Sequence, residues 1–379
     1  MITMLPAERL EAMFKGEKPD KVPWLADLTY WYESQVKRGM LSAKYQGDEG
    51  RLRLYKELGC GAHEELYMPV HRVRFEKCSV KTFVEQTKRG EVIRRTVYYT
   101  PIGILEKVEK YSPVSFSTSI LKYPVSSPRD LKVLAYLYRD MDIECNREMF
   151  SRQEYLIELW KGWGIVSSLP PRTPFARMVV EWAGALNTFR FYWRHRESLD
   201  EAVEEMALKD DIIYDIIRES PATFVYFGEN LSSDIISPRF FKEYFLDYYK
   251  KRSSELHSAG KYIYVHIDGR LKGLLSLIAE SGVDCAQSLT PWPAGDLKVE
   301  EFRREARDPN IILWGGVPGV LFSKEYSEST FREIVEKAVK VAREDRRFVI
   351  GVADQVPPDG IIKRVKLVTK VVEEKGVYE

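Results

Sequence analysis

The second half of the chain repeats one pattern: a short apolar run, a polar turn, and then a segment with apolar residues at helical spacing. Apolar runs between turns are typical of buried strands, and the amphipathic segments are typical of helices that cover a sheet. The expected strands span residues 223–227, 262–266, 283–289, 311–314 and 348–352. The expected helices span residues 238–259, 271–281, 299–305, 329–344 and 360–375. This half is therefore predicted to form parallel βα units.

Three further apolar segments supply the strands that an eight-stranded barrel still needs. They lie at residues 22–25, near 64–68 and at 164–168. No linker or low-complexity tract divides the chain, so we predict a single α/β domain over residues 1–379, a (β/α)8 TIM-type barrel, in preference to an open sheet. A helix at residues 7–15 extends the amino terminus, and alternation within 72–100 predicts a β-hairpin insertion.

The charge balance and the cysteines narrow the function classes. With 58 basic against 57 acidic residues the formal net charge is +1, so no overall field attracts nucleic acid or an anionic membrane, and we expect a small-molecule substrate. No apolar run approaches the roughly 20 residues of a membrane helix, and residues 1–6 contain no apolar signal core. The four cysteines are scattered without a CxxC pair, which favours free thiols in the cytoplasm.

The segment 261–269 carries the strongest candidate chemistry. It delivers His266 and Asp268 from an apolar strand into a turn, and strand alternation points both side chains the same way. In a parallel barrel the residues that follow each strand meet at one mouth. Carboxylates and an imidazole gathered there can bind a divalent metal or transfer protons, and the pattern leaves both open. The other residues at such positions are Asp27, Glu64 or Glu65, Glu229, Asn230, Gln287, Thr290, Gly315, Gly316, Asp354 and Gln355.

Each acidic candidate also has a structural interpretation. Asp268 precedes a predicted helix and would serve as its N-cap, and Glu229 would do the same or form a turn. Asp354 begins a turn-rich loop in which aspartate is ordinary. The coincidence of all three at strand ends favours function. The other histidines, His63 among them, show no partner pattern and are interpreted as structural, and Cys285 is expected to be buried in its strand.

Glycines and aromatic residues at two further strand ends are candidates for a substrate pocket. Gly315 and Gly316 allow close backbone approach to a ligand, or simply form a tight turn. Trp24 and Tyr30, near the end of the first strand, would wall a pocket for an apolar ligand, although core packing explains at least half of the aromatics in this segment. Gln287 is a further substrate-binding candidate.

Several motifs occur in order along nearly the whole chain. They are residues 16–23 (GEKPDKVP), 123–131 (YPVSSPRDL), 228–230 (GEN) with 236–241 (ISPRFF), 265–269 (VHIDG), 281–284 (SGVD) and 348–359. Together they resemble the uroporphyrinogen decarboxylase superfamily, which includes methyltransferases that act on methylated corrinoids. The resemblance implies a single α/β barrel.

Three departures separate the chain from true uroporphyrinogen decarboxylases. The resemblance places their arginine-rich segment, which holds the substrate's carboxylates, at residues 25–34, where this chain has no arginine. Their tyrosine falls near Val180, and their late histidine falls at Asp354. These differences argue against a porphyrinogen substrate.

The methyltransferase branch has a His-x-Cys pair and a distant cysteine that bind zinc and activate a thiol. His266 matches the histidine, while Asp268 and Asp354 stand where the cysteines would be. The resemblance therefore implies metal-assisted, corrinoid-linked methyl transfer on a small molecule, with zinc as the first candidate metal and no tightly bound organic cofactor. Glu229 and Asp27 are the candidate catalytic residues. A corrinoid protein is a candidate partner and a homodimer the candidate assembly, while decarboxylation and a non-catalytic binding paralogue are the alternatives.

Overall fold

The computed structural model describes residues 3–63 and 66–378, which form two compact units. The first unit contains residues up to 69, residues 148–169 and residues from 220 onward. The second unit contains residues 70–147 and 170–219. A single domain over residues 1–379 stays a prediction. Within the described part of the chain, no helix combines the length and apolarity that a membrane crossing requires.

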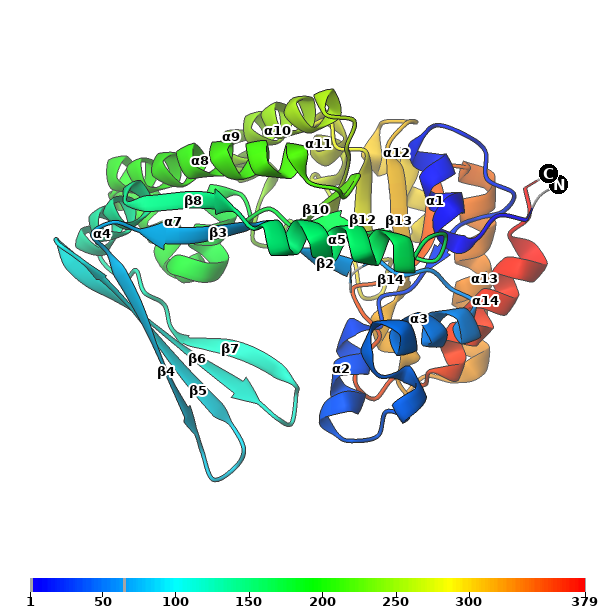
Figure 1. Ribbon diagram of the computed structural model, residues 1–379. Coiled ribbons are helices and arrows are strands. Elements are labelled where there is room, and N and C mark those ends of the chain that lie inside the picture. The colour runs from blue at the N-terminus through cyan, green and yellow to red at the C-terminus, as the bar shows by residue number, and fades with distance from the viewer. Residues whose placement is uncertain (1–2, 64–65, 379) are drawn as a thin grey trace. The chain divides into compact units, whose positions relative to one another are not determined.

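Among the described residues, eight parallel strands form the sheet of the first unit, in the order β1, β14, β13, β12, β11, β10, β9, β2 (Figure 1). Bridges join Leu25 to Gly61 and Ala62 to Gly164, so parallel pairing continues between β1 and the segment before β2. The predicted α/β fold with a curled parallel sheet is confirmed, and it is consistent with a TIM-type barrel. The strands are β1 (Trp24–Leu25), β2 (Tyr67–Met68), β9 (Ser167–Ser168), β10 (Phe224–Leu231), β11 (Tyr262–Ile267), β12 (Cys285–Leu289), β13 (Ile312–Pro318) and β14 (Phe348–Ala353).

The strand ends differ from the predicted ones in two ways. β1, β2 and β9 have two residues each, and residues 64 and 65 of the second predicted strand lie outside the described residues. β10 and β13 instead continue past the predicted ends at 227 and 314, because Leu231 pairs with Ile267 and Pro318 pairs with Ala353. Pairing with a neighbouring strand therefore overrides the local glycine signal.

Helices connect these strands, and one helix that was predicted to be continuous is broken. The expected helix at 238–259 is two helices that break at Phe245. Phe241, Phe245 and Tyr249 are fully buried, and the first two rings stack with centroids 5.4 Å apart. The break accommodates these rings, a tertiary demand that helical spacing does not reveal. The helices are α1 (Pro6–Phe14), α2 (Thr29–Lys37), α3 (Gly47–Leu58), α5 (Arg147–Leu159), α9 (Pro238–Tyr244), α10 (Leu246–Ser258), α11 (Leu275–Glu280), α12 (Phe302–Ala306), α13 (Glu328–Asp345) and α14 (Lys363–Lys375), with 3-10 turns at Ala43–Tyr45, Val299–Glu301 and Gly319–Phe322.

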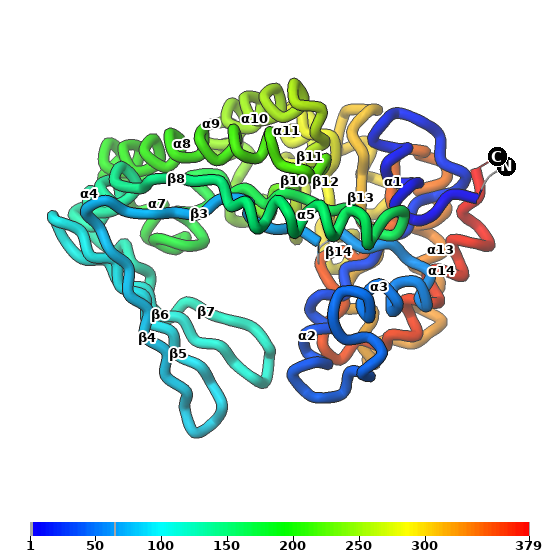
Figure 2. The backbone as a smooth tube through the Cα atoms, in the orientation of Figure 1, coloured from blue at the N-terminus to red at the C-terminus, as the bar shows by residue number. Residues whose placement is uncertain are grey.

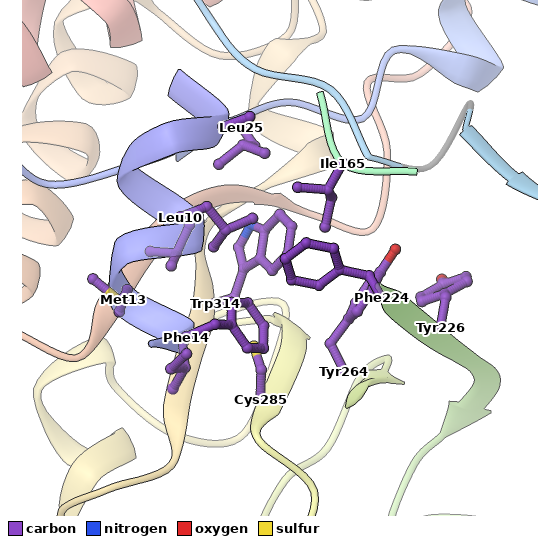
Figure 3. Close-up of a cluster of buried hydrophobic side chains, with 13 residues drawn as sticks. Leu10, Met13, Phe14, Leu25, Ile165, Phe224, Tyr226, Tyr264, Cys285 and Trp314 are labelled. Carbon is purple, nitrogen blue, oxygen red and sulfur yellow. The ribbon is translucent and has the colours of Figure 1, made fainter. Parts of the chain in front are cut away.

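A buried apolar cluster lies between α1 and the amino ends of the strands (Figure 3). Phe14 of α1 contacts Phe224, the first residue of β10, with ring centroids 5.1 Å apart. The rings of Tyr264 of β11 and Trp314 of β13 pack together with their centroids 5.6 Å apart. Cys285 is buried in the same cluster, as expected. Because α1 covers the amino ends, the polar side chains described below lie toward the carboxyl ends.

An ion pair on the outside of this sheet gives the first testable prediction. His257 Nε2 lies 2.9 Å from Asp284 Oδ2, and this hydrogen bond raises the pKa of His257 above its usual value of 6.5. Its stabilisation is fully present below pH 6.5 and is lost as the pH rises through the raised value. His257→Ala should therefore cost about 0.5 kcal/mol or less at pH 5.5, since the pair is partly exposed, and less still at pH 9. Urea unfolding at both pH values checks this, and an equal loss at pH 9 would contradict it.

The second unit combines antiparallel sheets with helices. β3 (His71–Phe75) pairs with β8 (Met141–Cys145), and four more strands of the described residues form an antiparallel meander, whose path Figure 2 traces. The sequence predicted only a hairpin within 72–100, because the charged residues of β6 hide the alternation beyond it. The meander strands are β4 (Ser79–Gln86), β5 (Val92–Thr100), β6 (Gly103–Ser112) and β7 (Ser117–Lys122). The helices are α4 (Pro128–Arg139), α6 (Pro174–Arg177), a π-helical turn at Met178–Trp182, α7 (Gly184–Arg194) and α8 (Arg196–Glu219).

Candidate functional site

His266 and Gln287 form the best-defined polar pair at the carboxyl ends of the strands. The register of β11 and β12 sets them directly side by side, and both are buried. His266 Nδ1 lies 2.7 Å from Gln287 Oε1. Because an amide oxygen only accepts, Nδ1 must donate, and in the neutral ring Nε2 is then the nitrogen with the lone pair. The pair therefore presents His266 as a base or a metal ligand through Nε2.

Asp268 and Asp354 lie one residue beyond β11 and β14. The Asp268 N–H donates to the Leu231 carbonyl at 2.8 Å, and the Asp354 N–H donates to Ser288 Oγ at 2.5 Å. Burial raises the pKa of the Asp354 carboxyl. The charge of His266 acts to lower this pKa, and the charge of Asp268 acts to raise it. Asp354 is nevertheless exposed to solvent, which screens much of this effect. The charges of His266 and Asp268 therefore both influence the Asp354 carboxyl, and the grouping of the three as metal ligands stays a prediction.

Left-handed backbone marks three of these strand ends. Asn230 has a φ of 54°, Ser288 of 71° and Asp354 of 67°. Residues with a side chain pay roughly 1–2 kcal/mol for this conformation, Asn and Asp less than others. Such strain persists only where the surroundings enforce it, and it clusters at functional sites. The hydrogen bond from the Asp354 backbone N–H to Ser288 Oγ ties two of the three positions together and holds the backbone at Asp354 in place.

The two predicted catalytic residues are both buried. Glu229 lies within β10 rather than after it, in the irregular stretch between Phe227 and Leu231. Asp27 follows β1, where its Oδ1 accepts the Thr29 N–H at 2.7 Å. The Asp27 carbonyl also accepts the Val356 N–H at 3.0 Å, which links this position to the loop that follows Asp354. Their catalytic roles stay predictions.

The predicted substrate-binding residues fall in different surroundings. The Trp24 indole donates to Thr369 Oγ1 of α14 at 3.0 Å, so this ring packs between β1 and a helix. Tyr30 is half-buried in α2. Gly315 lies within β13 and not in a turn, and a Cβ there would stand 2.5 Å from the Leu289 backbone nitrogen. The neighbouring strand therefore already requires glycine at 315.

Gly316 has a φ of 91°, a backbone conformation that residues with a side chain rarely adopt. A Cβ there would stand 3.4 Å from Ala338 of α13 and from the ring of Phe348, which is ordinary contact. Packing therefore explains Gly315 and backbone conformation explains Gly316, while a part in substrate binding stays a prediction for both. Gln287, in contrast, combines burial with an amide nitrogen that makes no hydrogen bond to the described residues. That donor makes Gln287 the strongest of the substrate-binding candidates.

His63 was interpreted from the sequence as structural, and the sequence gives no sign that it lies near enough to His266 for the two rings to influence each other. The His63 ring is buried, with its centroid 4.4 Å from that of Trp314 and 6.2 Å from that of Tyr264. Burial, and to a smaller extent the nearby His266, lowers the pKa of His63 to about 3. His63 is therefore a neutral ring beneath the candidate site. The two residues are too far apart in the sequence for any spacing motif to connect them.

The metal prediction was compared with the geometry of the described residues. Over residues 3–63 and 66–378, no three or more His, Cys, Asp or Glu side chains form a group that could hold a metal ion. The chemistry of one imidazole and two carboxylates suits a divalent ion, but Asp268 and Asp354 would have to approach His266. Both aspartates lie at the solvent edge, beyond the ends of their strands.

An eight-stranded parallel α/β sheet with buried polar residues at its carboxyl ends is the arrangement of barrel enzymes. The model of the uroporphyrinogen decarboxylase (URO-D) family matches residues 165–375, more than half of the chain, and the protein belongs to this family. A methyltransferase from Methanosarcina mazei has a similar structure, with a TM-score of 0.60 at 14% sequence identity. The match covers 98% of this chain and 99% of that one, which shows a shared fold. No curated protein matches the sequence.

Proposed function

We propose that the protein is an enzyme that transfers a methyl group to or from a small molecule at the site around His266. The observation that carries the proposal is the hydrogen bond from His266 Nδ1 to Gln287 Oε1, which leaves Nε2 of the neutral ring as the nitrogen with the lone pair. Gln287 Nε2 would donate to an acceptor atom of the substrate. A cytoplasmic location and a corrinoid protein as methyl donor belong to the same proposal.

The residues after β1 favour methyl transfer over decarboxylation. A porphyrinogen carries several carboxylates, for which arginine is the natural partner. Residues 25–34 contain none, and Asp354 would repel a substrate carboxylate when ionised. The fold shared with a methyltransferase adds support. A decarboxylase, with Asp27 and Asp354 positioning a proton, is the second candidate.

A divalent metal, zinc first, is part of the proposal. His266 Nε2 and the carboxylates of Asp268 and Asp354 would hold it, and it would lower the pKa of a bound thiol or similar methyl acceptor. Gln287 would fix the ring so that Nε2 faces the ion, the usual role of a second partner behind a metal-bound histidine. Metal analysis of the purified protein tests this: one bound ion is expected, and His266→Ala should lose it.

The reaction is tested with methylcobalamin and a panel of small thiols. The methyl group should move from cobalt to the thiolate sulfur, leaving cob(I)alamin, which absorbs at different wavelengths. Uroporphyrinogen III should remain unchanged under the same conditions. Decarboxylation of uroporphyrinogen without any methyl transfer would replace the proposal with its alternative.

The role of Gln287 gives a second prediction. Gln287→Leu removes the acceptor of the His266 proton, and kcat should fall about 10- to 100-fold, the usual effect of losing such a partner. Gln287→Glu keeps an acceptor oxygen for the His266 proton but loses the amide donor, so kcat should fall less than in the leucine variant while KM rises. Steady-state kinetics of both variants, with thermal unfolding as a check on folding, make the comparison. Full activity of the leucine variant would remove Gln287 from the mechanism.

A further inference from the structure

β4 is a long and exposed edge strand of the second unit. It lies at one end of the order β4, β5, β6, β7, with β5 as its only neighbour among the described strands (Figure 1). All eight of its residues are exposed, including Val80 (40%), Phe83 (50%) and Val84 (63%). Its pairing with β5 runs without a bulge, and it contains no proline. Edges of this kind attract another strand unless charges or irregularities prevent it.

We propose that β4 pairs antiparallel with β4 of a second copy of this chain, around a two-fold axis at Phe83. The two four-stranded sheets then become one continuous sheet across the dimer. A closed two-fold contact of this kind uses the same surface on both copies, so the strand must be complementary to itself. The sequence of β4 can be tested for that property directly.

Geometry leaves two registers that pair seven residues of β4. A two-fold axis perpendicular to the sheet leaves each side chain on the same face of the sheet in both copies. Residues paired across the two strands must point to the same face, so their positions in the sequence differ by an even number. The axis therefore passes through a residue, either Thr82 or Phe83. At Thr82, Lys81 faces the partner's Phe83 and Glu85 faces the partner's Ser79. Neither charge is matched in that register.

The register centred on Phe83 matches the charges. Lys81 faces the partner's Glu85, and by symmetry Glu85 faces the partner's Lys81. Opposite charges directly across a strand pair are stabilising, and like charges are destabilising. Phe83 faces its own copy, which forms an aromatic pair on the same face, where Arg95 of β5 already lies 5.9 Å from the Phe83 ring. On the other face Thr82 meets the partner's Val84.

Charge reversal tests the proposal on the full chain. The wild-type protein should sediment as a dimer over a concentration series. Lys81→Glu places glutamate opposite glutamate twice and should weaken the dimer by about tenfold or more. Glu85→Lys should do the same, and the double variant Lys81→Glu/Glu85→Lys should restore dimerisation because both pairs are opposite again. A wild-type monomer at all concentrations, or single variants that dimerise normally, would overturn the proposal.

Cysteine cross-linking tests the register itself. Phe83→Cys lies on the two-fold axis and should form a disulfide-linked dimer on mild oxidation. Gln86→Cys is the matched control, since the two copies of residue 86 would lie roughly 20 Å apart at about 3.4 Å per residue. Cross-linking of the control but not of Phe83→Cys would exclude this register. Neither experiment depends on enzymatic activity, so this proposal and the methyl-transfer proposal fail independently.

Discussion

Replacing His266 with alanine should reduce methyl transfer about 10²- to 10⁴-fold, the range expected when a positioned acid–base group or its equivalent is removed. His266 is buried and is oriented by its hydrogen bond with Gln287. The loss should appear mainly in kcat if the ring acts on the reacting atoms. Steady-state kinetics with methylcobalamin measure it.

A matched control separates this effect from loss of structure. His257→Ala also removes an imidazole from the first unit, but from a partly exposed pair with Asp284. It should leave kcat and KM unchanged, and both variants should keep the circular dichroism of the wild type. Normal activity of His266→Ala would place the chemistry elsewhere in the molecule.

Replacing Trp314 with alanine should lower the free energy of unfolding by about 3–5 kcal/mol, the range for deleting a large buried ring. Trp314 is fully buried among the rings of His63 and Tyr264. A Cβ on Gly351 would stand 2.5 Å from its indole nitrogen, so the ring fills the space above that glycine. Alanine would leave a cavity that rigid strands on several sides cannot close.

Urea unfolding measures this loss, with Trp193→Ala as the control. Trp193 is 66% exposed, so its replacement should change the free energy of unfolding by about 0.5 kcal/mol or less. A loss below about 1 kcal/mol for Trp314→Ala would show that the surrounding side chains collapse into the space, against the packing described.

The fold was predictable from the sequence where local pattern and tertiary structure agree. β11, β12 and β14 lie close to their predicted positions, because buried parallel strands are mostly apolar and have turn residues on both sides. The extension of β13 through Gly315 was not predictable, since its pairing with β14 decides it. The break at Phe245 likewise depends on how three aromatic rings pack.

The candidate site was predictable only in part. His266 and Asp268 stand out because a polar pair interrupts an apolar strand at its end. The contact of His266 with Gln287 depends on the register of two strands, which no pattern within either strand specifies. The outward direction of the Trp24 indole depends on α14, which lies far along the chain. The position of His63 near His266 likewise depends on contacts between segments that are far apart in the sequence.

Nitrogen-15 spectra of the histidine side chains would test the arrangement of the site without any substrate. The chain has five histidines, so His266→Ala assigns the signals of interest. The account predicts that His266 carries its proton on Nδ1, and that one equivalent of zinc shifts the Nε2 signal in the wild type but much less in Gln287→Leu. A His266 ring with its proton on Nε2, and unaffected by zinc, would contradict it.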